Sequence, residues 1–138
     1  MTDCPVGKSK NRLLAVDDNL DSAELIRRIA ARSGYEARTA STLPEIRSQI
    51  VDWRPDVLTL DLCMPDSDGI DLMELLHQAN FAGRLIIVSG HDPWLLRSAR
   101  RLATARGFDV VDDIRKPLDP TRFRQLLESL SGSSDAAA

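Results

Sequence analysis

The sequence predicts an α/β domain built on a parallel sheet. Short apolar runs recur along the chain at fairly even intervals. Each run is followed by a segment whose apolar residues fall at helical spacing. A strand followed by a helix, repeated five times, is typical of a parallel sheet with helices packed against it.

The five expected strands are LLAV (13–16), YEART (35–39), DVLTL (56–60), LIIV (85–88) and FDVV (108–111). The first, third and fourth are almost continuously apolar, as expected for strands that helices cover on both faces. The second alternates between polar and apolar residues, which favours a place at an edge of the sheet.

The first two expected helices have recognisable ends. The first stops at Gly34, a residue suited to a helix C-terminus. The second opens with Thr42-Leu43-Pro44-Glu45, a capping box with proline in the first turn. The apolar stripe of the first helix is predicted to contain Leu20, Ala23, Ile26, Ile29 and Ala30.

The last three expected helices follow the third, fourth and fifth strands. Two of them open with an Asp-Pro pair, which suits a helix start. They are a third helix with Ile70, Met73 and Leu76, a fourth running from Asp92-Pro93 to Gly107, and a fifth opening at Asp119-Pro120 with Phe123, Leu126, Leu127 and Leu130.

One domain accounts for most of the 138 residues. We expect it at residues 12–131, with flexible tails at 1–11 and 132–138. Hydrophobic residues make up 43% of the chain and charged residues 28%, which is ordinary for a globular protein. The net charge of -3 argues against a general binder of nucleic acid or of anionic membranes.

The expected location is the cytoplasm. No apolar stretch approaches the roughly 20 residues that cross a bilayer. The first residues lack the apolar core of a secretory signal. Cys4 and Cys63 do not form the pattern of a disulfide framework, which is consistent with a reducing compartment.

Chemically active residues follow the expected strands. Asp17 and Asp18 come after the first strand, Asp61 after the third, Ser89 after the fourth and Lys116 after the fifth. The carboxyl ends of neighbouring parallel strands share one rim of the sheet, where sites of such folds form. These five side chains are therefore expected to converge.

This combination of groups suggests phosphoryl transfer. Carboxylates packed closely repel one another, and a divalent cation relieves the repulsion. Ligand sets made only of oxygen favour Mg²⁺. A magnesium ion, a lysine and a hydroxyl around one free carboxylate suit phosphoryl transfer with that carboxylate as the nucleophile.

Four motifs in this order resemble the receiver domain of two-component response regulators. They are AVDDN, DLCMPDSDG, VSG and RKP, and the resemblance runs from about Arg12 to Leu130. It implies a flavodoxin-like (βα)5 fold, a doubly wound parallel sheet with strand order 2-1-3-4-5. It also implies a domain that catalyses only its own phosphorylation and dephosphorylation, and is not a turnover enzyme.

The resemblance assigns roles to the strand-end residues. Asp61 would accept a phosphoryl group from a phosphohistidine on a sensor histidine kinase or phosphotransfer protein. Lys116 would contact the phosphoryl oxygens, and Ser89 would move to hydrogen-bond the group once it arrives. Cys63 and His91 occupy positions that tune dephosphorylation in the family.

The same resemblance implies a magnesium site. Asp18 would bind the ion directly, with Asp17 nearby or acting through water. Asp61 and the backbone carbonyl of Cys63 would complete the protein ligands.

The sequence departs from the family pattern in two places. The position three residues before Lys116, where the family usually has an aromatic residue, holds Asp113. A carboxylate there is expected to pair with a nearby arginine. The segment from Ser89 to Lys116 is also several residues longer than usual. In this respect the sequence resembles the variant receivers found ahead of EAL domains.

The fourth expected helix is rich in arginine, with Arg97, Arg100, Arg101 and Arg106 beside an apolar stripe. One interpretation is a solvated basic face over a packed one. The other is that the fourth and fifth helical segments form a docking surface for an output domain, a partner or a second copy.

Other interpretations of the acidic residues stay open. Without Asp61 and Lys116 at the matching strand ends, Asp17 and Asp18 would be interpreted as N-caps of the first helix. Asp66 and Asp68 are expected to shape a loop and cap the third helix. The protein would be a haloacid dehalogenase-type phosphatase if a second aspartate followed the nucleophile by two residues, but Cys63 stands there. A degenerate receiver that acts only as a protein-interaction module is the remaining alternative.

Overall fold

A five-stranded parallel sheet forms the centre of the computed structural model, which describes residues 11–62, 69–90 and 93–137. The strand order is β2-β1-β3-β4-β5, and every neighbouring pair is parallel. The predicted fold class and strand order are therefore confirmed. The strands are β1 (Arg12–Val16), β2 (Glu36–Ala40), β3 (Val57–Asp61), β4 (Arg84–Ser89) and β5 (Asp109–Arg115).

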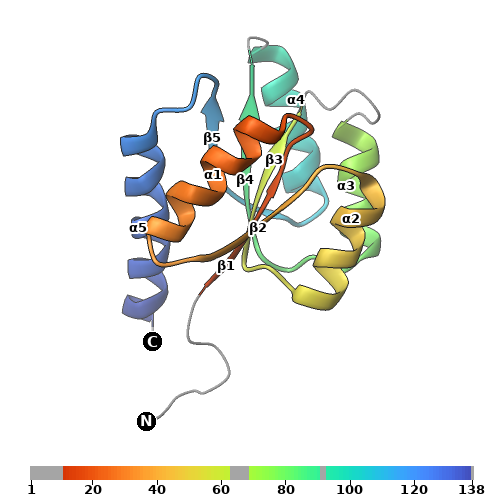
Figure 1. Ribbon diagram of the computed structural model, residues 1–138. Helices are drawn as coiled ribbons and strands as arrows, with labels where there is room; N and C mark the ends of the chain where they lie inside the picture. The colour runs from red at the N-terminus through yellow and green to blue at the C-terminus, as the bar shows by residue number, and fades with distance from the viewer. Residues whose placement is uncertain (1–10, 63–68, 91–92, 138) are drawn as a thin grey trace.

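Helices cover both faces of this sheet (Figure 1). α1 and α5 pack on one face, around buried residues that include Ile26 and Phe123. α2, α3 and α4 pack on the other, around a larger apolar cluster that includes Ile46, Leu72 and Leu96. The helices are α1 (Leu20–Arg32), α2 (Leu43–Ser48) with the π-helix η1 (Gln49–Trp53), α3 (Gly69–Gln78), α4 (Pro93–Ala105) and α5 (Pro120–Ala137).

Local sequence signals account for several helix ends. Thr42 and Glu45 form the predicted capping box at the start of α2. Gly34 adopts a left-handed φ of 92° just after α1, a conformation that costs little without a Cβ. The side chain of Asp119 accepts hydrogen bonds from the backbone N–H groups of Thr121 and Arg122, and so caps α5.

Three elements differ from the expectation. Leu20 was expected in the apolar stripe of α1, but its side chain is 71% exposed. It is the first residue of α1, and so lies beyond the part of the helix that packs on the sheet. β5 continues to Arg115 instead of ending at 111, and a bulge opposite Leu85 and Ile86 adjusts its register. α5 continues to Ala137, past the expected domain end at residue 131.

Some sequence-based predictions lie outside the described residues. They concern most of the 1–11 tail, the loop roles of Asp66 and Asp68, and the positions Cys63 and His91. These assignments stay predictions.

Candidate functional site

Three polar residues are buried at the carboxyl ends of adjoining strands. Asp17 directly follows β1, Asp61 ends β3 and Ser89 ends β4, with exposed fractions of 0%, 3% and 2%. The register of the sheet aligns these ends, since Val16 pairs with Leu60, and Asp61 with Val88. Three of the five residues expected to converge therefore lie on the same rim of the sheet.

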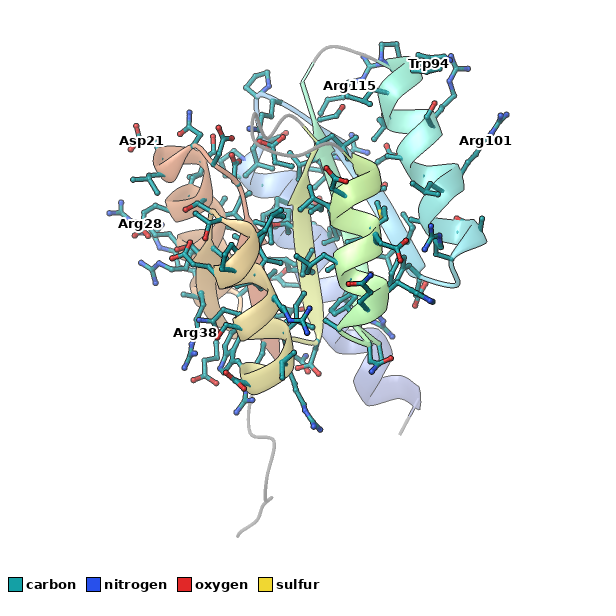
Figure 2. The ribbon with its side chains drawn as sticks, turned by 90° about the vertical axis from the view of Figure 1, so that its right-hand side faces the viewer. Asp21, Arg28, Arg38, Trp94, Arg101 and Arg115 are labelled. Atoms are coloured by element: carbon teal, nitrogen blue, oxygen red, sulfur yellow. The ribbon has the colours of Figure 1, made fainter. Side chains whose placement is uncertain are left out.

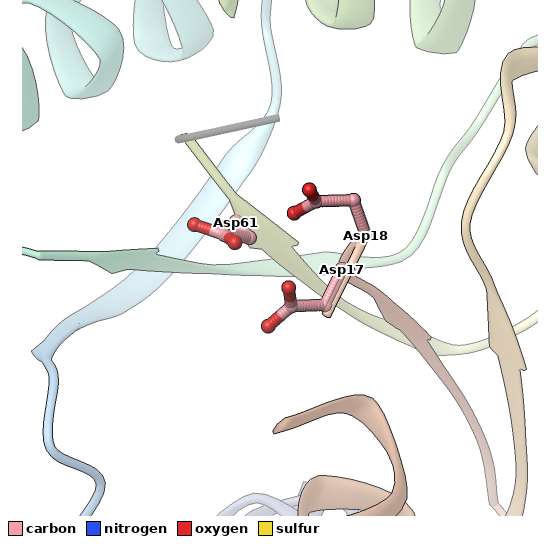
Figure 3. Close-up of side chains that lie close together, drawn as sticks. All are labelled: Asp17, Asp18 and Asp61. Carbon is pink, nitrogen blue, oxygen red and sulfur yellow. The ribbon is translucent and has the colours of Figure 1, made fainter. Parts of the chain in front are cut away.

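The three aspartates lie close together at this rim (Figure 3). Asp17, Asp18 and Asp61 each offer a carboxylate oxygen, and these oxygens lie within 4.8 Å of one another. Asp18 is exposed to solvent, whereas the other two are buried. The group therefore has one side open to incoming ions and one side enclosed by the sheet.

Lys116 supplies the positive charge of the site. Its Nζ lies 3.2 Å from Oδ2 of Asp17 and 3.2 Å from Oδ2 of Asp61. Its backbone N–H donates a 2.7 Å hydrogen bond to the carbonyl oxygen of Ser89, which fixes the residue beside the end of β4. The following peptide bond, to Pro117, is cis.

Burial and mutual repulsion alter the protonation of this cluster. Burial, with further contributions from a hydrogen bond to Asp61 and from its charge, raises the pKa of Asp17 to about 6. The Asn19 N–H and Lys116 oppose this shift. Burial alone would lower the pKa of Lys116, but the charges of Asp61 and Asp17 outweigh it and raise that pKa.

The donor set fits a hard divalent cation. Three carboxylates lie close together, and Lys116 contacts the two that are buried, Asp17 and Asp61. Such a cluster is relieved by a cation that takes oxygen ligands and keeps several waters. The acidic group is therefore a candidate divalent-metal site.

Asn19 is the residue that sequence reasoning missed. Its side chain accepts a 3.1 Å hydrogen bond from the Ser22 N–H and caps α1. Its own backbone N–H donates a 2.9 Å hydrogen bond to Oδ1 of Asp17. Asn19, and not Asp17 or Asp18, is thus the helix cap, and it holds Asp17 toward the site. An asparagine directly before the first helical residue was the available signal.

Asp113 pairs with an arginine, as expected for a carboxylate at this position. Arg100 of α4 donates from Nη1 to Oδ2 of Asp113 on β5. Asp113 lies three residues before Lys116 on the same stretch of chain and opposite Ile87 of β4. The ion pair therefore links α4 to the strand that leads into the site.

A double-mutant cycle of Arg100→Gln and Asp113→Asn measures this link. Because both side chains are partly exposed, we expect a coupling of about 0.5–1 kcal/mol in urea unfolding at low salt. The coupling should shrink in high salt, since screening weakens partly exposed pairs. Additive effects of the two substitutions would contradict the contact.

Comparisons with known proteins agree with the fold and identify the family. The sequence model described as "Response regulator receiver domain" matches residues 13–128. The chain is 32% identical over 119 residues to the transcriptional regulatory protein DcuR of Escherichia coli, covering 83% of this chain and 48% of DcuR. It is 28% identical over 123 residues to the chemotaxis protein CheY of Thermotoga maritima, covering 87% of this chain and 97% of CheY.

A solved structure is also similar. The crystal structure of a response regulator from Colwellia psychrerythraea superposes with a TM-score of 0.79 at 30% identity, covering 91% of this chain and 99% of that one. The chain spans about half the length of DcuR, whereas it spans nearly all of CheY.

A doubly wound parallel sheet with three aspartates and a lysine at the carboxyl ends of its strands is the arrangement that the sequence resemblance to receiver domains implied. The chain belongs to the response regulator receiver domain family. It is a phosphoacceptor signalling module and not a true enzyme, and receiver domains are phosphorylated by histidine kinases. This membership removes the haloacid dehalogenase-type phosphatase as an alternative. None of these relatives supports the closer resemblance to receivers found ahead of EAL domains.

No helix in the described part of the chain combines the length and the apolar character that a membrane span requires.

Proposed function

We propose that Asp61 is the phosphoryl acceptor of this receiver domain and that its modification is Mg²⁺-dependent. The observation that carries the proposal is the position of Asp61, buried at the end of β3 beside Asp17 and bound by Lys116. A carboxylate held between a cation-binding group and an ammonium is suited to nucleophilic attack on phosphorus.

In the proposed reaction, an oxygen of Asp61 attacks the phosphorus of a phosphohistidine. The new O–P bond forms an acyl phosphate while the N–P bond breaks, and the histidine leaves with its ring nitrogen pair. Lys116 lies beside Asp61 and would hold the transferred oxygens by charge-assisted hydrogen bonds. Ser89, at the end of the neighbouring strand, would donate its hydroxyl to the modified group.

Asp17 and Asp18 would hold the magnesium ion with Asp61, and the carbonyl of Cys63 is the further ligand that the family pattern implies. The ion would neutralise negative charge on the phosphoryl oxygens during transfer. Asn19 would keep the Asp17 carboxylate oriented through its backbone N–H.

The test is incubation with acetyl phosphate and Mg²⁺, followed by intact mass. We expect one added phosphoryl group in the wild type, none in Asp61→Asn, and strong inhibition by a chelator. Asp52→Asn, an exposed substitution on η1, which precedes the start of β3 and so lies at the opposite end of that strand from Asp61, is the matched control and should be labelled like the wild type. Equal labelling of Asp61→Asn would reject the assignment.

We propose a sensor histidine kinase or a phosphotransfer protein as the upstream partner. The downstream partner would be an output domain or a second copy that contacts α4 and α5. Histidine kinases use ATP, so the cytoplasm is the compartment that this function requires. Acyl phosphate formation would bias the positions of α4 and β5, and the Arg100–Asp113 ion pair is one contact between them that would respond.

A further inference from the structure

An open cavity lies at the amino ends of the strands, opposite the acidic rim. Its volume is about 1030 Å³, and its lining includes the first residues of four strands, Arg12, Val57, Arg84 and Asp109. β3 alone separates Val57 from Asp61 by about 13 Å, since a strand rises about 3.3 Å per residue. We call this cavity the amino-end pocket. It is large enough for a small organic molecule and lies outside the residues that the proposed phosphorylation uses.

Backbone contacts hold the walls of the amino-end pocket in place. The N–H of Arg84 donates a 2.8 Å hydrogen bond to the carbonyl oxygen of Asp56, whose own N–H donates one of 2.8 Å to the carbonyl oxygen of Arg12. A Cβ at Gly83 would clash with the Asp56 carbonyl oxygen, so glycine permits this close approach. The segments that precede β3 and β4 are therefore fixed against each other, and the pocket is preformed.

Two residues of the lining have an unusual backbone conformation. Arg54 and Asn80 have φ values of 57° and 59°, and they are the non-glycine residues with a positive φ in the part of the chain that the structure describes. Asparagine adopts this conformation more readily than arginine. Arg54 also directly follows the π-helix η1. Left-handed residues and short π-helices are both frequent at functional sites, so this wall of the pocket is where we expect a ligand contact.

The lining carries more positive than negative charge. Its described residues include four arginines and two aspartates, on a chain whose net charge is -3. Two of the arginines, Arg12 and Arg84, lie 3.4 and 3.9 Å from carboxylate oxygens. Within the described ranges, the guanidinium groups of Arg47 and Arg54 have no carboxylate partner, and both residues are exposed. The pocket therefore offers two guanidinium groups to an anion.

Apolar side chains lie in the same lining. Val51 of η1 is 47% exposed, although valine is usually buried, and Ile50 and Phe81 line the pocket near it in the sequence and across from it in the fold. An apolar wall with a few charged groups is typical of small-molecule sites.

We propose that the amino-end pocket binds a small molecule that carries an oxyanion, a phosphate or a carboxylate, on an apolar body. Arg47 and Arg54 would hold the oxyanion, because the planar guanidinium group matches the geometry of both anions with paired hydrogen bonds. The apolar body would pack on Val51. Charge complementarity carries the choice of ligand, since a cation or a neutral molecule would leave both guanidinium groups unused.

The probes are naphthyl phosphate, naphthoate and the neutral naphthol, each titrated into the protein and followed by amide NMR spectra. The titrations use Asp61→Asn without Mg²⁺, so their result does not depend on phosphorylation. We expect saturable shifts at Arg54, Asn80 and Arg84, and binding of naphthol that is weaker by about tenfold or more. The anion that binds more tightly identifies the oxyanion as phosphate or carboxylate.

Substitutions of the two arginines test the site. Arg47→Gln/Arg54→Gln should weaken binding of the anions by about tenfold or more. Arg97→Gln/Arg101→Gln removes the same charge from exposed positions of α4 and should bind like the parent protein; Figure 2 shows Arg101 pointing away from the body of the molecule. Arg54→Gly should also bind weakly, and because glycine accepts the left-handed φ of this position, unfolding would not explain that loss.

Four outcomes would overturn the proposal. The first is that neither anion produces saturable shifts. The second is that naphthol binds as tightly as the anions, which would show an apolar contact alone. The third is an equal loss of affinity in the α4 control, which would show a general charge effect. The fourth is that the shifts are confined to the surroundings of Asp17 and Lys116, which would place the anion at the acidic rim.

Discussion

Asp17→Asn is expected to stabilise the metal-free domain at neutral pH while weakening Mg²⁺ binding. The folded protein holds a proton on Asp17 up to about pH 6, whereas the ordinary pKa is 3.8. Between these values the folded state binds more protons than the unfolded state, so stability falls as pH rises and levels off above pH 7. The loss amounts to at most about 3 kcal/mol. Asparagine removes the charge but still accepts the Asn19 hydrogen bond.

Urea unfolding of wild type and variant at pH 5 and pH 8 measures this effect. We expect the variant to be more stable by about 1–3 kcal/mol at pH 8 without metal, with a much smaller difference at pH 5. Adding Mg²⁺ should stabilise the wild type far more than the variant, because only the wild type retains the full acidic group. Asp21→Asn, an exposed change on α1, should shift stability by less than about 0.5 kcal/mol. A destabilised Asp17→Asn at pH 8 would contradict the explanation.

Lys116→Met should have the opposite effect on the metal-free domain. It removes the ammonium that lies 3.2 Å from both Asp17 and Asp61 while keeping much of the apolar stem. Two buried carboxylates then lose their counter-charge, at a cost of about 2 kcal/mol after allowance for the partial exposure of the lysine. The cost should grow as pH rises through about 6, where Asp17 ionises. Labelling by acetyl phosphate should slow by about tenfold or more, since the contact with the transferred oxygens is lost.

The double variant Asp17→Asn/Lys116→Met separates this electrostatic explanation from a packing defect. With one carboxylate neutralised, removal of the ammonium should cost much less than in the wild type, so the two changes are not additive. An equal cost of Lys116→Met in both backgrounds would show that lost packing, and not charge, is responsible.

The sheet and the position of the site could be predicted because both depend on local patterns. Apolar runs mark β1, β3 and β4, and the polar residues that end them, Asp17, Asp61 and Ser89, must share a rim once the strands are parallel and adjacent. That argument needs no knowledge of side-chain contacts.

What could not be predicted depends on contacts between distant residues. The charged residues Asp112 and Asp113 end the apolar pattern of the fifth strand, yet β5 continues because Arg100 of α4 neutralises Asp113 and a bulge adjusts the register. Leu20 fits the helical spacing of α1 but lies at the first turn, beyond the surface that packs on the sheet. Periodicity indicates which face of a helix is apolar, but not where the neighbouring layer ends.

The helices on the two faces beside β5, α4 and α5, make polar contacts of different kinds. The hydroxyl of Tyr35 donates a buried 2.8 Å hydrogen bond to the carbonyl oxygen of Leu127, which anchors α5 across the molecule. α4 packs on the sheet through buried Leu96 and Ala99, but the ion pairs at this end of the sheet are partly exposed and are made by Arg100 and by Arg106, which directly follows the helix. At about 0.1 M salt, interactions between exposed charges are screened over a distance of about 10 Å. A buried hydrogen bond is hardly affected. High ionic strength should therefore weaken the ion pairs of Arg100 and Arg106, while the hydrogen bond between Tyr35 and α5 persists.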